Sequence, residues 1–494
     1  MTDSNLALDP ETFRQLGYRA VDMAADHLTG IRDRPVYRPM TPDQRAELLD
    51  QPLPREGQSP ADILDRFAET VLPFPMGNGH PRFFGWVNSP PAHLSVIAEL
   101  LAAAMDPSAA GGDHAAIYVE RAAVRWLMGL VEFPTEGSMG ILVSGGSMAS
   151  LTCLAAARHR LALRHGWNDR RDGMSGEHPP LVVYLSREAH TTLHKAVELL
   201  GLGTQSLRVI PVDDEFRIDV PALREAITAD RAAGRLPFCV AASAGTVATG
   251  AIDPLDLLAD ICAEEDLWLH VDGAYGAVGI LDPDRHDRYA GMGRADSLAI
   301  DPHKWLSIPV ECGCAIVRDG ALLRDTFSLV PSYVRTEEGR GIGGLPWYSE
   351  YGFQQSRGFR ALKLWMTMQH VGRDGYARLI TRHNALARTL AAMVDAAPDL
   401  ERLAPVELSI VCFRYRPDGM LSDNPSLDAL NKAIMEDVQT RGEAFITQTA
   451  IGGHFGLRAN IIHYATNEDD LHALVEIVQA TGARIAGAVR NVSA

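Results

Sequence analysis

Lysine is scarce in this chain, which takes its positive charge almost entirely from arginine. The only lysines are Lys195, Lys304, Lys363 and Lys432. An arginine serves equally well on a solvated surface, but it stays protonated, whereas a desolvated lysine can become a nucleophile and form a Schiff base. Lys304 follows an apolar run within Asp301-Pro302-His303-Lys304-Trp305. It is therefore a candidate covalent attachment point, with an ordinary loop lysine as the alternative.

The chain also lacks an excess of basic residues and any long apolar run. Its formal net charge is -17, which argues against a nucleic-acid partner or an anionic membrane surface, because both need a basic footprint. No apolar run is long enough to cross a bilayer, and no signal peptide precedes the first expected helix. We therefore expect a cytoplasmic protein with neither a nucleic-acid nor a membrane partner.

Cysteine is sparse as well, and its pattern favours reduced thiols. The six cysteines are scattered, mostly within apolar runs, where a buried thiol is the simplest interpretation. Cys312-Gly313-Cys314 has the form of half a metal site, but no second cysteine or histidine cluster has the spacing of metal ligands. We therefore expect no metal.

Strands and helices alternate through the middle of the chain, which at 494 residues is too long for a single core. Apolar runs predict strands at residues 141–144, 181–185, 207–212, 238–242, 268–271, 297–300 and 315–317. Helical patterns between them cover residues 148–163, 191–201, 220–233 and 254–265. The alternation predicts an α/β fold with a mostly parallel sheet and helices on both faces.

The two ends of the chain have different patterns. Amphipathic helices are expected at residues 10–28 and 59–71, and with no sheet of their own they must pack on the body or on a second copy of the chain. Residues 320–358 show little periodicity and read as a functional loop. Helices at 359–370 and 376–397 precede a mixture of strands and helices. We therefore expect an N-terminal helical segment packing across a dimer (1–85), a large α/β domain (86–370) and a small C-terminal α+β domain (371–494).

Residues suited to catalysis follow several of the predicted strands. Asp272 ends the strand at 268–271, His190 follows the strand at 181–185, and Thr246 follows the strand at 238–242. Ligands of open α/β sheets bind at the carboxyl ends of the strands. A lysine that forms a Schiff base with pyridoxal phosphate needs an Asp or Arg partner for the pyridine nitrogen, and Asp272 fits that need. A metal ligand or a helix cap is the plainer alternative for this aspartate.

Ser144-Gly145-Gly146-Ser147 connects a predicted strand to a helix. Its glycines allow backbone N–H groups to approach a ligand, and the helix N-terminus carries partial positive charge, so the segment suits a phosphate. The same residues nearly match the nucleophile elbow of α/β-hydrolases, in which Ser147 would attack an ester with His303 and Asp272 as partners. A serine cap on a buried helix is the third interpretation.

Together these motifs resemble the group II pyridoxal-phosphate-dependent decarboxylases, and most closely the aromatic-L-amino-acid decarboxylase branch. The resemblance spans nearly the whole chain. It runs through His80-Pro81, Ala189-His190, Val271-Asp272-Gly273-Ala274-Tyr275, Pro302-His303-Lys304-Trp305 and Phe359-Arg360-Ala361-Leu362-Lys363-Leu364-Trp365. It implies a fold-type I homodimer that binds pyridoxal 5'-phosphate (PLP) and converts an L-amino acid, aromatic by preference, to its amine and CO₂.

The resemblance also implies roles for individual residues. Lys304 would hold PLP as an internal aldimine, Asp272 would pair with its pyridine nitrogen, and His190 would stack on the ring. The protonated ring would then accept the charge left at Cα, as a quinonoid. Thr246 and Ala274 would contact the ring, and Gly146, Ser147 and His303 would lie near the phosphate. Tyr333 would return a proton to Cα, where a phenylalanine marks aldehyde-forming relatives.

Residues for the substrate are predicted around the aromatic stretch 79–90 and at one C-terminal position. His80, Trp86 and Ser89 belong to that stretch, and Arg458 matches a position that binds carboxylates in some relatives. Two departures from the family pattern bear on this prediction. Met105-Asp106-Pro107-Ser108-Ala109 is smaller and more polar than in the aromatic branch, and Asp301 stands where the family has a phosphate-proximal asparagine. A decarboxylase for a non-aromatic side chain, an aldehyde-forming relative and a serine hydrolase using Ser147 are the alternative functions.

Overall fold

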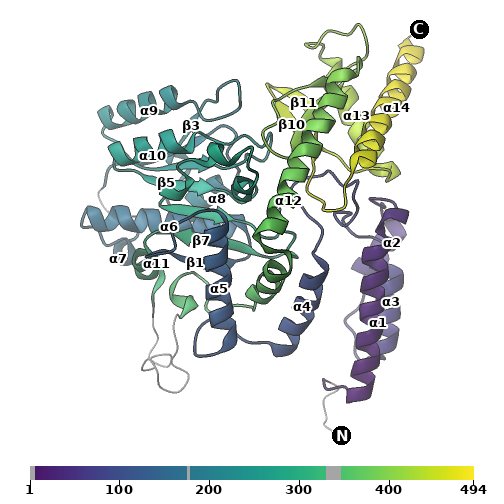
Figure 1. Ribbon diagram of the computed structural model, residues 1–494, viewed down its shortest axis with the longest axis horizontal. Helices are drawn as coiled ribbons and strands as arrows, with labels where there is room; N and C mark the ends of the chain where they lie inside the picture. The colour runs from purple at the N-terminus through teal and green to yellow at the C-terminus, as the bar shows by residue number, and fades with distance from the viewer. Residues whose placement is uncertain (1–5, 175–177, 330–346, 494) are drawn as a thin grey trace.

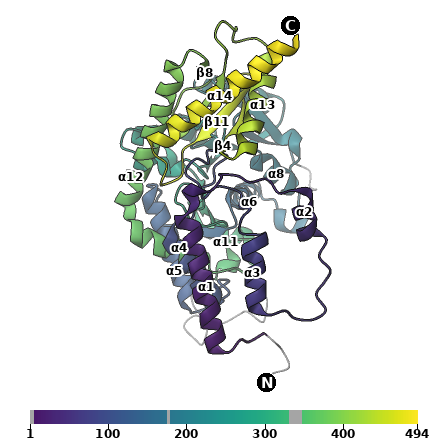
Figure 2. The same cartoon turned by 90° about the vertical axis from the view of Figure 1, so that its right-hand side faces the viewer.

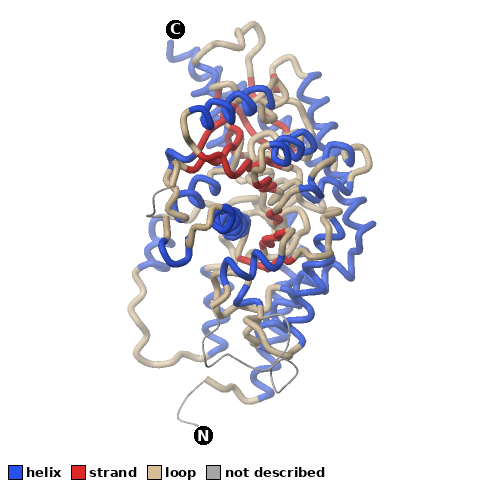
Figure 3. Tube along the Cα trace, turned by 90° about the vertical axis from the view of Figure 1, so that its left-hand side faces the viewer, coloured by secondary structure: helices blue, strands red, loops and turns tan. Residues whose placement is uncertain are grey.

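The computed structural model describes residues 6–174, 178–329 and 347–493. Three parts are visible in Figure 1: a large sheet wrapped by helices, a smaller sheet beneath the helices of the C-terminal third, and the N-terminal helices along one edge. Figure 3 shows the strands enclosed between helices. This arrangement confirms the predicted α/β class.

The large sheet has seven strands in the order β1-β7-β6-β5-β4-β2-β3. They are β1 (Met139–Val143), β2 (Leu181–Ser186), β3 (Leu207–Ile210), β4 (Leu236–Ser243), β5 (Trp268–Asp272), β6 (Ser297–Ile300) and β7 (Gly313–Val317). β7 is antiparallel to both of its neighbours, and the remaining pairs are parallel. Six strands therefore point the same way, and their carboxyl ends share one edge of the sheet.

Both faces of this sheet are buried, as the side-chain alternation along β2 illustrates. Val182 and Tyr184 face one apolar core, while Leu181, Val183 and Leu185 face the other. Successive side chains of a strand point to opposite faces, so a strand covered on both sides is a continuous apolar run. That is why the seven predicted strands agree with β1 to β7 to within about two residues at each end.

Helices cover the two faces in separate layers. On one face, α6 (Gly146–Arg164) crosses the centre of the sheet and packs against α8 (Thr192–Leu199) and α11 (Gly320–Phe327). On the other face lie α5 (Ala115–Leu130), α9 (Val220–Ala232), α10 (Leu255–Glu264) and the first part of α12 (Ala361–Ala396). A short helix, α7 (Asp169–Asp172), follows α6.

The C-terminal third forms a second, antiparallel sheet in the order β10-β11-β9-β8. Its strands are β8 (Leu400–Arg402), β9 (Ile410–Tyr415), β10 (Thr447–Ile451) and β11 (His454–Asn460), covered by α13 (Ser426–Arg441) and α14 (Glu468–Ser493). The helix α12 reaches from the large sheet to this smaller one, and Gly372, with φ of 68°, interrupts its helical geometry. We propose the domain boundary near residue 370, beside this interruption.

The N-terminal helices α1 (Pro10–Thr29), α2 (Pro42–Leu49) and α3 (Pro60–Thr70) contain no buried residue. Figure 2 shows α1 and α3 side by side, and an ion pair between Arg19 and Asp65 joins them. The next helix, α4 (His93–Met105), packs on α12 but leaves Ile97, Leu100 and Leu101 about half exposed.

Several elements were missed by the sequence prediction. No helix was expected between residues 28 and 59, where α2 lies, or in the stretch after residue 90, where α4 lies. The expected loop at 320–358 begins with α11, so that prediction was wrong for its first eight residues. By contrast, the break expected between the helices at 359–370 and 376–397 is present, because Gly372 has non-helical backbone geometry within α12. Within residues 6–174, 178–329 and 347–493, no helix combines the length and apolarity that crossing a bilayer requires.

Candidate active site

A cavity of about 350 Å³ opens at the carboxyl edge of the large sheet. The segments that follow β1, β2, β4, β5 and β6 all contribute to it, together with the stretch before α4. Nine of the residues predicted from the sequence line it: Trp86, Gly146, Ser147, His190, Thr246, Asp272, Ala274, His303 and Lys304. Residues far apart in the chain therefore meet here because parallel strands end at one edge.

Lys304 lies in the turn that follows β6. Its Nζ is 3.0 Å from Oδ2 of Asp301, and its side chain keeps 22% of its exposure. The backbone N–H of Lys304 also donates to the carbonyl of Asp301 at 2.9 Å, which closes the turn. The lysine is thus held at the wall of the cavity with its amine accessible from inside it.

Asp272 is the last residue of β5, the strand that pairs in parallel with β6. Its Oδ1 accepts a hydrogen bond from the backbone N–H of Ala274 at 3.1 Å, which orients the carboxylate just beyond the strand end. Because Asp272 and Lys304 come from neighbouring parallel strands, their side chains line the same cavity from two sides.

His190 follows β2 and precedes α8. Its Nδ1 accepts the backbone N–H of Thr192 at 3.2 Å, so a neutral ring carries its hydrogen on Nε2. Burial lowers the pKa of His190 because it disfavours the imidazolium, with Asp272 opposing and Lys304 adding to that effect. The ring is therefore neutral at neutral pH, and both charged groups of the cavity lie close enough to act on it.

The glycine loop after β1 leads into α6 without a side-chain cap, so its first N–H groups stay available to a ligand. A Cβ on Gly146 would lie 2.8 Å from Oδ2 of Asp301 and 3.0 Å from Cβ of Ala274. Only glycine fits at this position. His303 packs against Gly145 of this loop. Its Nδ1 accepts the backbone N–H of Cys312 at 3.1 Å.

Thr246 supports the cavity from the segment after β4. Its hydroxyl accepts the backbone N–H of Ala251 at 3.1 Å and lies 3.0 Å from the hydroxyl of Thr249. Gly245, with φ of 101°, packs against Gly276 in the turn after β5. The threonine is 2% exposed, so it forms a fixed wall.

Three predicted substrate residues, His80, Ser89 and Arg458, are not among the residues that line the cavity. Ser89 donates to the carbonyl of His303 at 3.3 Å, and Nδ1 of His80 accepts the backbone N–H of Arg82 at 2.9 Å. Buried Arg458 donates through Nη1 to the carbonyl of Trp86 at 2.9 Å, while its Nη2 has no hydrogen-bond partner within the described part of the chain. Trp86 itself lines the cavity and is 48% exposed. Tyr333 lies outside the described residues.

Some lining residues were not singled out from the sequence. Val87 and Asn88 belong to the aromatic stretch already expected to line a pocket, and Tyr275 belongs to the motif around Asp272. Thr192 and Val247 carry no sequence signal, because a threonine or valine at a helix start or turn is unremarkable. Ser147 has no hydrogen bond to a histidine in the part of the chain that the structure describes, which disfavours its interpretation as a nucleophile.

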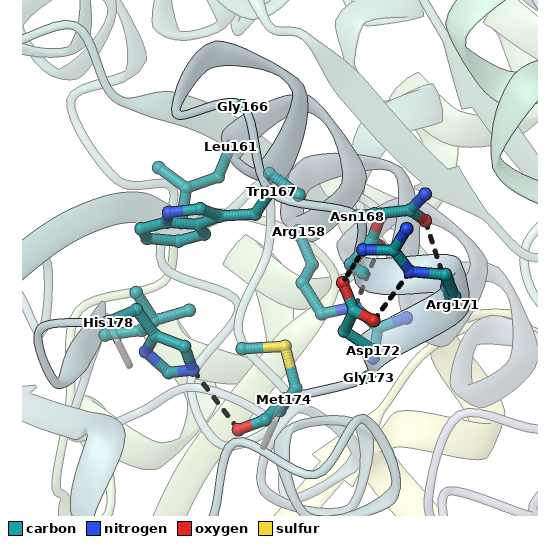
Figure 4. A pocket seen from close by; sticks show the side chains of 13 residues that line it. Arg158, Leu161, Gly166, Trp167, Asn168, Arg171, Asp172, Gly173, Met174 and His178 are labelled. Atoms are coloured by element: carbon teal, nitrogen blue, oxygen red, sulfur yellow. Dashed lines mark hydrogen bonds and ion pairs between the residues drawn. The ribbon is translucent and has the colours of Figure 1, made fainter. Parts of the chain in front are cut away.

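A second cavity, of about 270 Å³, lies near the C-terminal end of α6, at the opposite edge of the large sheet (Figure 4). Trp167, Met174 and His178 form one side of it. Its polar groups are engaged with one another: Arg171 with Asp172 at 2.7 Å, and Nε2 of His178 with the carbonyl of Met174 at 3.2 Å. No residue predicted from the sequence lines this cavity.

The residues of the first cavity fit PLP. The uncapped start of α6 suits its phosphate, and the space beneath Gly146 would be filled by a Cβ. Lys304 would supply the amine that the aldehyde requires, and Asp272 would supply a carboxylate for the ring nitrogen. The fold and the site thus define a lysine-dependent PLP enzyme.

Comparisons with known proteins give the family. The model of the pyridoxal-dependent decarboxylase conserved domain matches residues 42–416. An aromatic-L-amino-acid decarboxylase of Bacillus atrophaeus is 34% identical over 96% of each chain. The structure of Oryza sativa TDC with PLP and tryptamine superposes with a TM-score of 0.89 at 27% identity, covering 98% of this chain and 100% of that one. Mouse CSAD superposes with a TM-score of 0.88 at 26% identity, covering 96% and 99%.

This chain belongs to the pyridoxal-dependent decarboxylase family, and it is a PLP-dependent amino acid decarboxylase. The resemblance seen in the sequence and the predicted cofactor are thereby confirmed.

Proposed function

We propose that this enzyme decarboxylates aromatic L-amino acids to the corresponding amines, with Lys304, Asp272 and His190 in the predicted roles. One observation carries the assignment of roles: these three side chains come from the ends of three different strands and line one cavity. The similarity to an aromatic-L-amino-acid decarboxylase supports the substrate class.

The protein groups divide the work of the reaction. When bound, PLP supplies a ring that accepts the electron pair left at Cα after CO₂ departs. Asp272 would keep a proton at the ring nitrogen, and the neutral imidazole of His190 would lie against the ring without adding positive charge. The uncapped start of α6, with Gly146 and Ser147, would hold the phosphate and so fix the position of the reacting atoms.

The substrate side chain would enter past Trp86. Trp86, Val87 and Val247 give this part of the cavity an apolar surface, which suits an aromatic ring. Arg458 and Asn460 both donate to the backbone carbonyl of Trp86 at 2.9 Å and so fix the main chain that presents the indole. In this proposal Arg458 positions Trp86, while Ser89 and His80 support the loops on either side.

A second candidate substrate class is an amino acid with an acidic side chain. The unpartnered Nη2 of buried Arg458 favours it, because a buried guanidinium N–H left without an acceptor is costly. The two classes are separated by measuring kcat/KM for tryptophan, tyrosine and phenylalanine against glutamate and cysteine sulfinate. A preference for the acidic substrates, lost in Arg458→Met, would replace the aromatic assignment.

Replacing Lys304 tests the proposed attachment point. We expect Lys304→Ala to lower CO₂ release roughly 10³-fold, and borohydride treatment of the PLP-loaded wild type to leave a pyridoxyl group on Lys304 in a mass-spectrometric digest. Lys432→Ala is the control, because Lys432 lies exposed on α13. A pyridoxyl group on another lysine, or undiminished activity in Lys304→Ala, would contradict the proposal.

Tyr333 is proposed as the group that protonates Cα, on the basis of the family resemblance. Tyr333→Phe should therefore slow amine formation about 10²-fold and divert part of the substrate to an aldehyde with release of peroxide. Amine and peroxide are measured together for each variant. Amine release at the normal rate without peroxide would remove Tyr333 from the mechanism.

We also propose a homodimer in the cytoplasm. Phe13, Tyr18 and Val21 of α1 and Ile63 and Phe67 of α3 are all at least 41% exposed, a patch that a second copy would cover. All six cysteines are free and buried, as a reducing compartment would keep them. Sedimentation of the purified protein tests the first statement, where a monomer would refute it, and cell fractionation tests the second.

A further inference from the structure

Asp301 is an acid in an unusual place. Its side chain is 3% exposed and lines the cavity directly beneath the glycine loop. A Cβ on Gly146 would meet its Oδ2 at 2.8 Å, and one on Gly313 would meet its Oδ1 at 2.8 Å. Oδ2 pairs with Nζ of Lys304 at 3.0 Å, whereas Oδ1 is buried and has no hydrogen-bond partner among the residues that the structure describes.

The surroundings offer Asp301 little other positive charge. The titratable groups that face it are His303 and Lys304 on its own loop, His190 before α8, Asp272 on β5, and Cys312 and Cys314 at β7. Burial lowers the pKa of His303 and raises that of Cys312 to about 12, so both are neutral at neutral pH. Nε2 of His303 is 3.7 Å from Oδ2 of Asp301. Among the described residues, Lys304 is thus the cation paired with this carboxylate.

Cofactor capture removes that cation and brings in an anion. Lys304 reacts only as a neutral amine, so its ammonium must first lose a proton. The phosphate would then lie at the start of α6, where Gly146 is packed against Asp301. A buried carboxylate beside a phosphate, without a counter-charge, would be strongly unfavourable. A proton on Asp301 removes the conflict, and the nearest source of that proton is Lys304.

We propose that Asp301 takes the proton that Lys304 gives up when the cofactor binds, and that the resulting neutral acid faces the phosphate as a hydrogen-bond donor. In this step an N–H bond of the Lys304 ammonium breaks and an O–H bond forms on Asp301. The neutral amine then bonds to the aldehyde carbon, and its two remaining hydrogens leave with the aldehyde oxygen as water. The site therefore keeps one proton inside it during capture.

The test compares the wild type with Asp301→Asn, whose amide is a donor that needs no proton. The dissociation constant for PLP is measured from pH 6 to 9 by fluorescence quenching of the apoenzyme. PLP has ionisable groups of its own, but they affect both proteins equally. Their effect therefore cancels when the affinity of Asp301→Asn is divided by that of the wild type at each pH. If Asp301 holds the proton, the affinity of Asp301→Asn relative to wild type should rise by about tenfold or more across this range, since one bound proton changes an affinity tenfold per pH unit.

A ratio that stays flat or falls with pH would overturn the proposal, because an ionised Asp301 would release the lysine proton in the wild type too. The same titration with pyridoxal, which has no phosphate, should give no rise. An equal rise with pyridoxal would refute the phosphate-facing role.

The proposal rests on PLP as cofactor and not on the substrate class, so failure to bind PLP at all would overturn both this proposal and the proposed function. Circular dichroism and thermal melting confirm that Asp301→Asn is folded, and Asp296→Asn, outside the cavity, is the control for the loss of an acid.

Discussion

At the scale of single residues, the site depends on where each charge is placed. Asp272 is held at the end of β5 by one backbone N–H, and His190 stays neutral beside it. An acid that is fixed by the backbone needs no reorganisation when the cofactor arrives, which is the condition for efficient electrostatic catalysis. The carboxylate of Asp272 is therefore the group whose charge should matter most for the rate.

Asp272→Asn tests that statement. The amide keeps the shape of the side chain but cannot stabilise a proton on the ring nitrogen, so we expect kcat to fall roughly 10²- to 10³-fold, while the borohydride label on Lys304 persists. Asp256→Asn, on the exposed side of α10, is the control. Unchanged kcat in Asp272→Asn would show that the ring nitrogen needs no acid partner in this enzyme.

Much of the residue-level site could be predicted, because the signal lies in the motif and in its place after a strand. Lys304, Asp272, His190 and the glycine loop each follow a buried strand, and parallel strands bring their ends together. The partnership of Asp301 with Lys304 could not be predicted. An i,i+3 spacing outside a helix does not determine which side chains meet.

At the scale of elements, a buried ion pair joins the segments that frame the site. Glu120 of α5 and Arg357, just before α12, are each 1% exposed and bind one another through two contacts. Arg357 also donates to the carbonyls of Ala109 and Leu142, and Glu120 accepts the backbone N–H of Leu142 at 3.0 Å. This pair ties α5, β1 and the start of α12 to one another.

Breaking the pair should destabilise the fold strongly. Glu120→Gln leaves the guanidinium of Arg357 buried without its counter-charge, which typically costs about 3–5 kcal/mol. Glu264→Gln is the matched control: its pair with Arg224 is about half exposed and screened by solvent, so its loss should have a far smaller effect. Both are read from the free energy of unfolding in urea. Equal effects of the two substitutions would contradict the argument.

The elements themselves were predicted unevenly, for physical reasons. β1 to β7 are continuous apolar runs because both faces are buried, so they stand out in the sequence. β10, with the sequence Thr-Gln-Thr-Ala-Ile, has exposed positions and a polar composition, and β8 has only three residues. Neither β8 nor β10 therefore has a hydrophobic pattern that identifies it as a strand without its neighbouring strands in the sheet. The burial of Glu120 was equally invisible, because one acid on an amphipathic helix normally marks the solvated face.

At the scale of the whole molecule, buried neutral histidines set a limit on acid stability. Burial lowers the pKa of His270 to about 4, of His383 to about 3 and of His463 to about 4. The folded pKa values lie below the unfolded value near 6.5, so the unfolded chain binds more protons below that pH. Stability is therefore present above pH 6.5 and is lost as the pH falls from there towards 4. Asp253, whose pKa burial raises to about 6, works in the opposite direction.

The free energy of unfolding should consequently drop by several kcal/mol between pH 7.5 and pH 5, with about 2 kcal/mol from each of the three histidines. His383→Gln should reduce this drop by about 2 kcal/mol, and His286→Gln, at a half-exposed position, serves as the surface control. Urea unfolding at the two pH values measures both. A free energy of unfolding that does not change between pH 7.5 and 5 would mean that these histidines titrate alike in the folded and unfolded chains.

Trp305, the residue after Lys304, donates through Nε1 to Nδ1 of His383 in α12 at 2.9 Å. Nε2 of His383 donates to the carbonyl of His463 at 3.2 Å, and Nε2 of His463 donates to that of Gly79 at 2.8 Å. The turn that carries Lys304 is thus held by a chain of hydrogen bonds that joins segments near residues 79, 305, 383 and 463. If the chain were divided into two fragments, we expect neither fragment to form the active site when expressed alone. Activity should return only when the two fragments fold together.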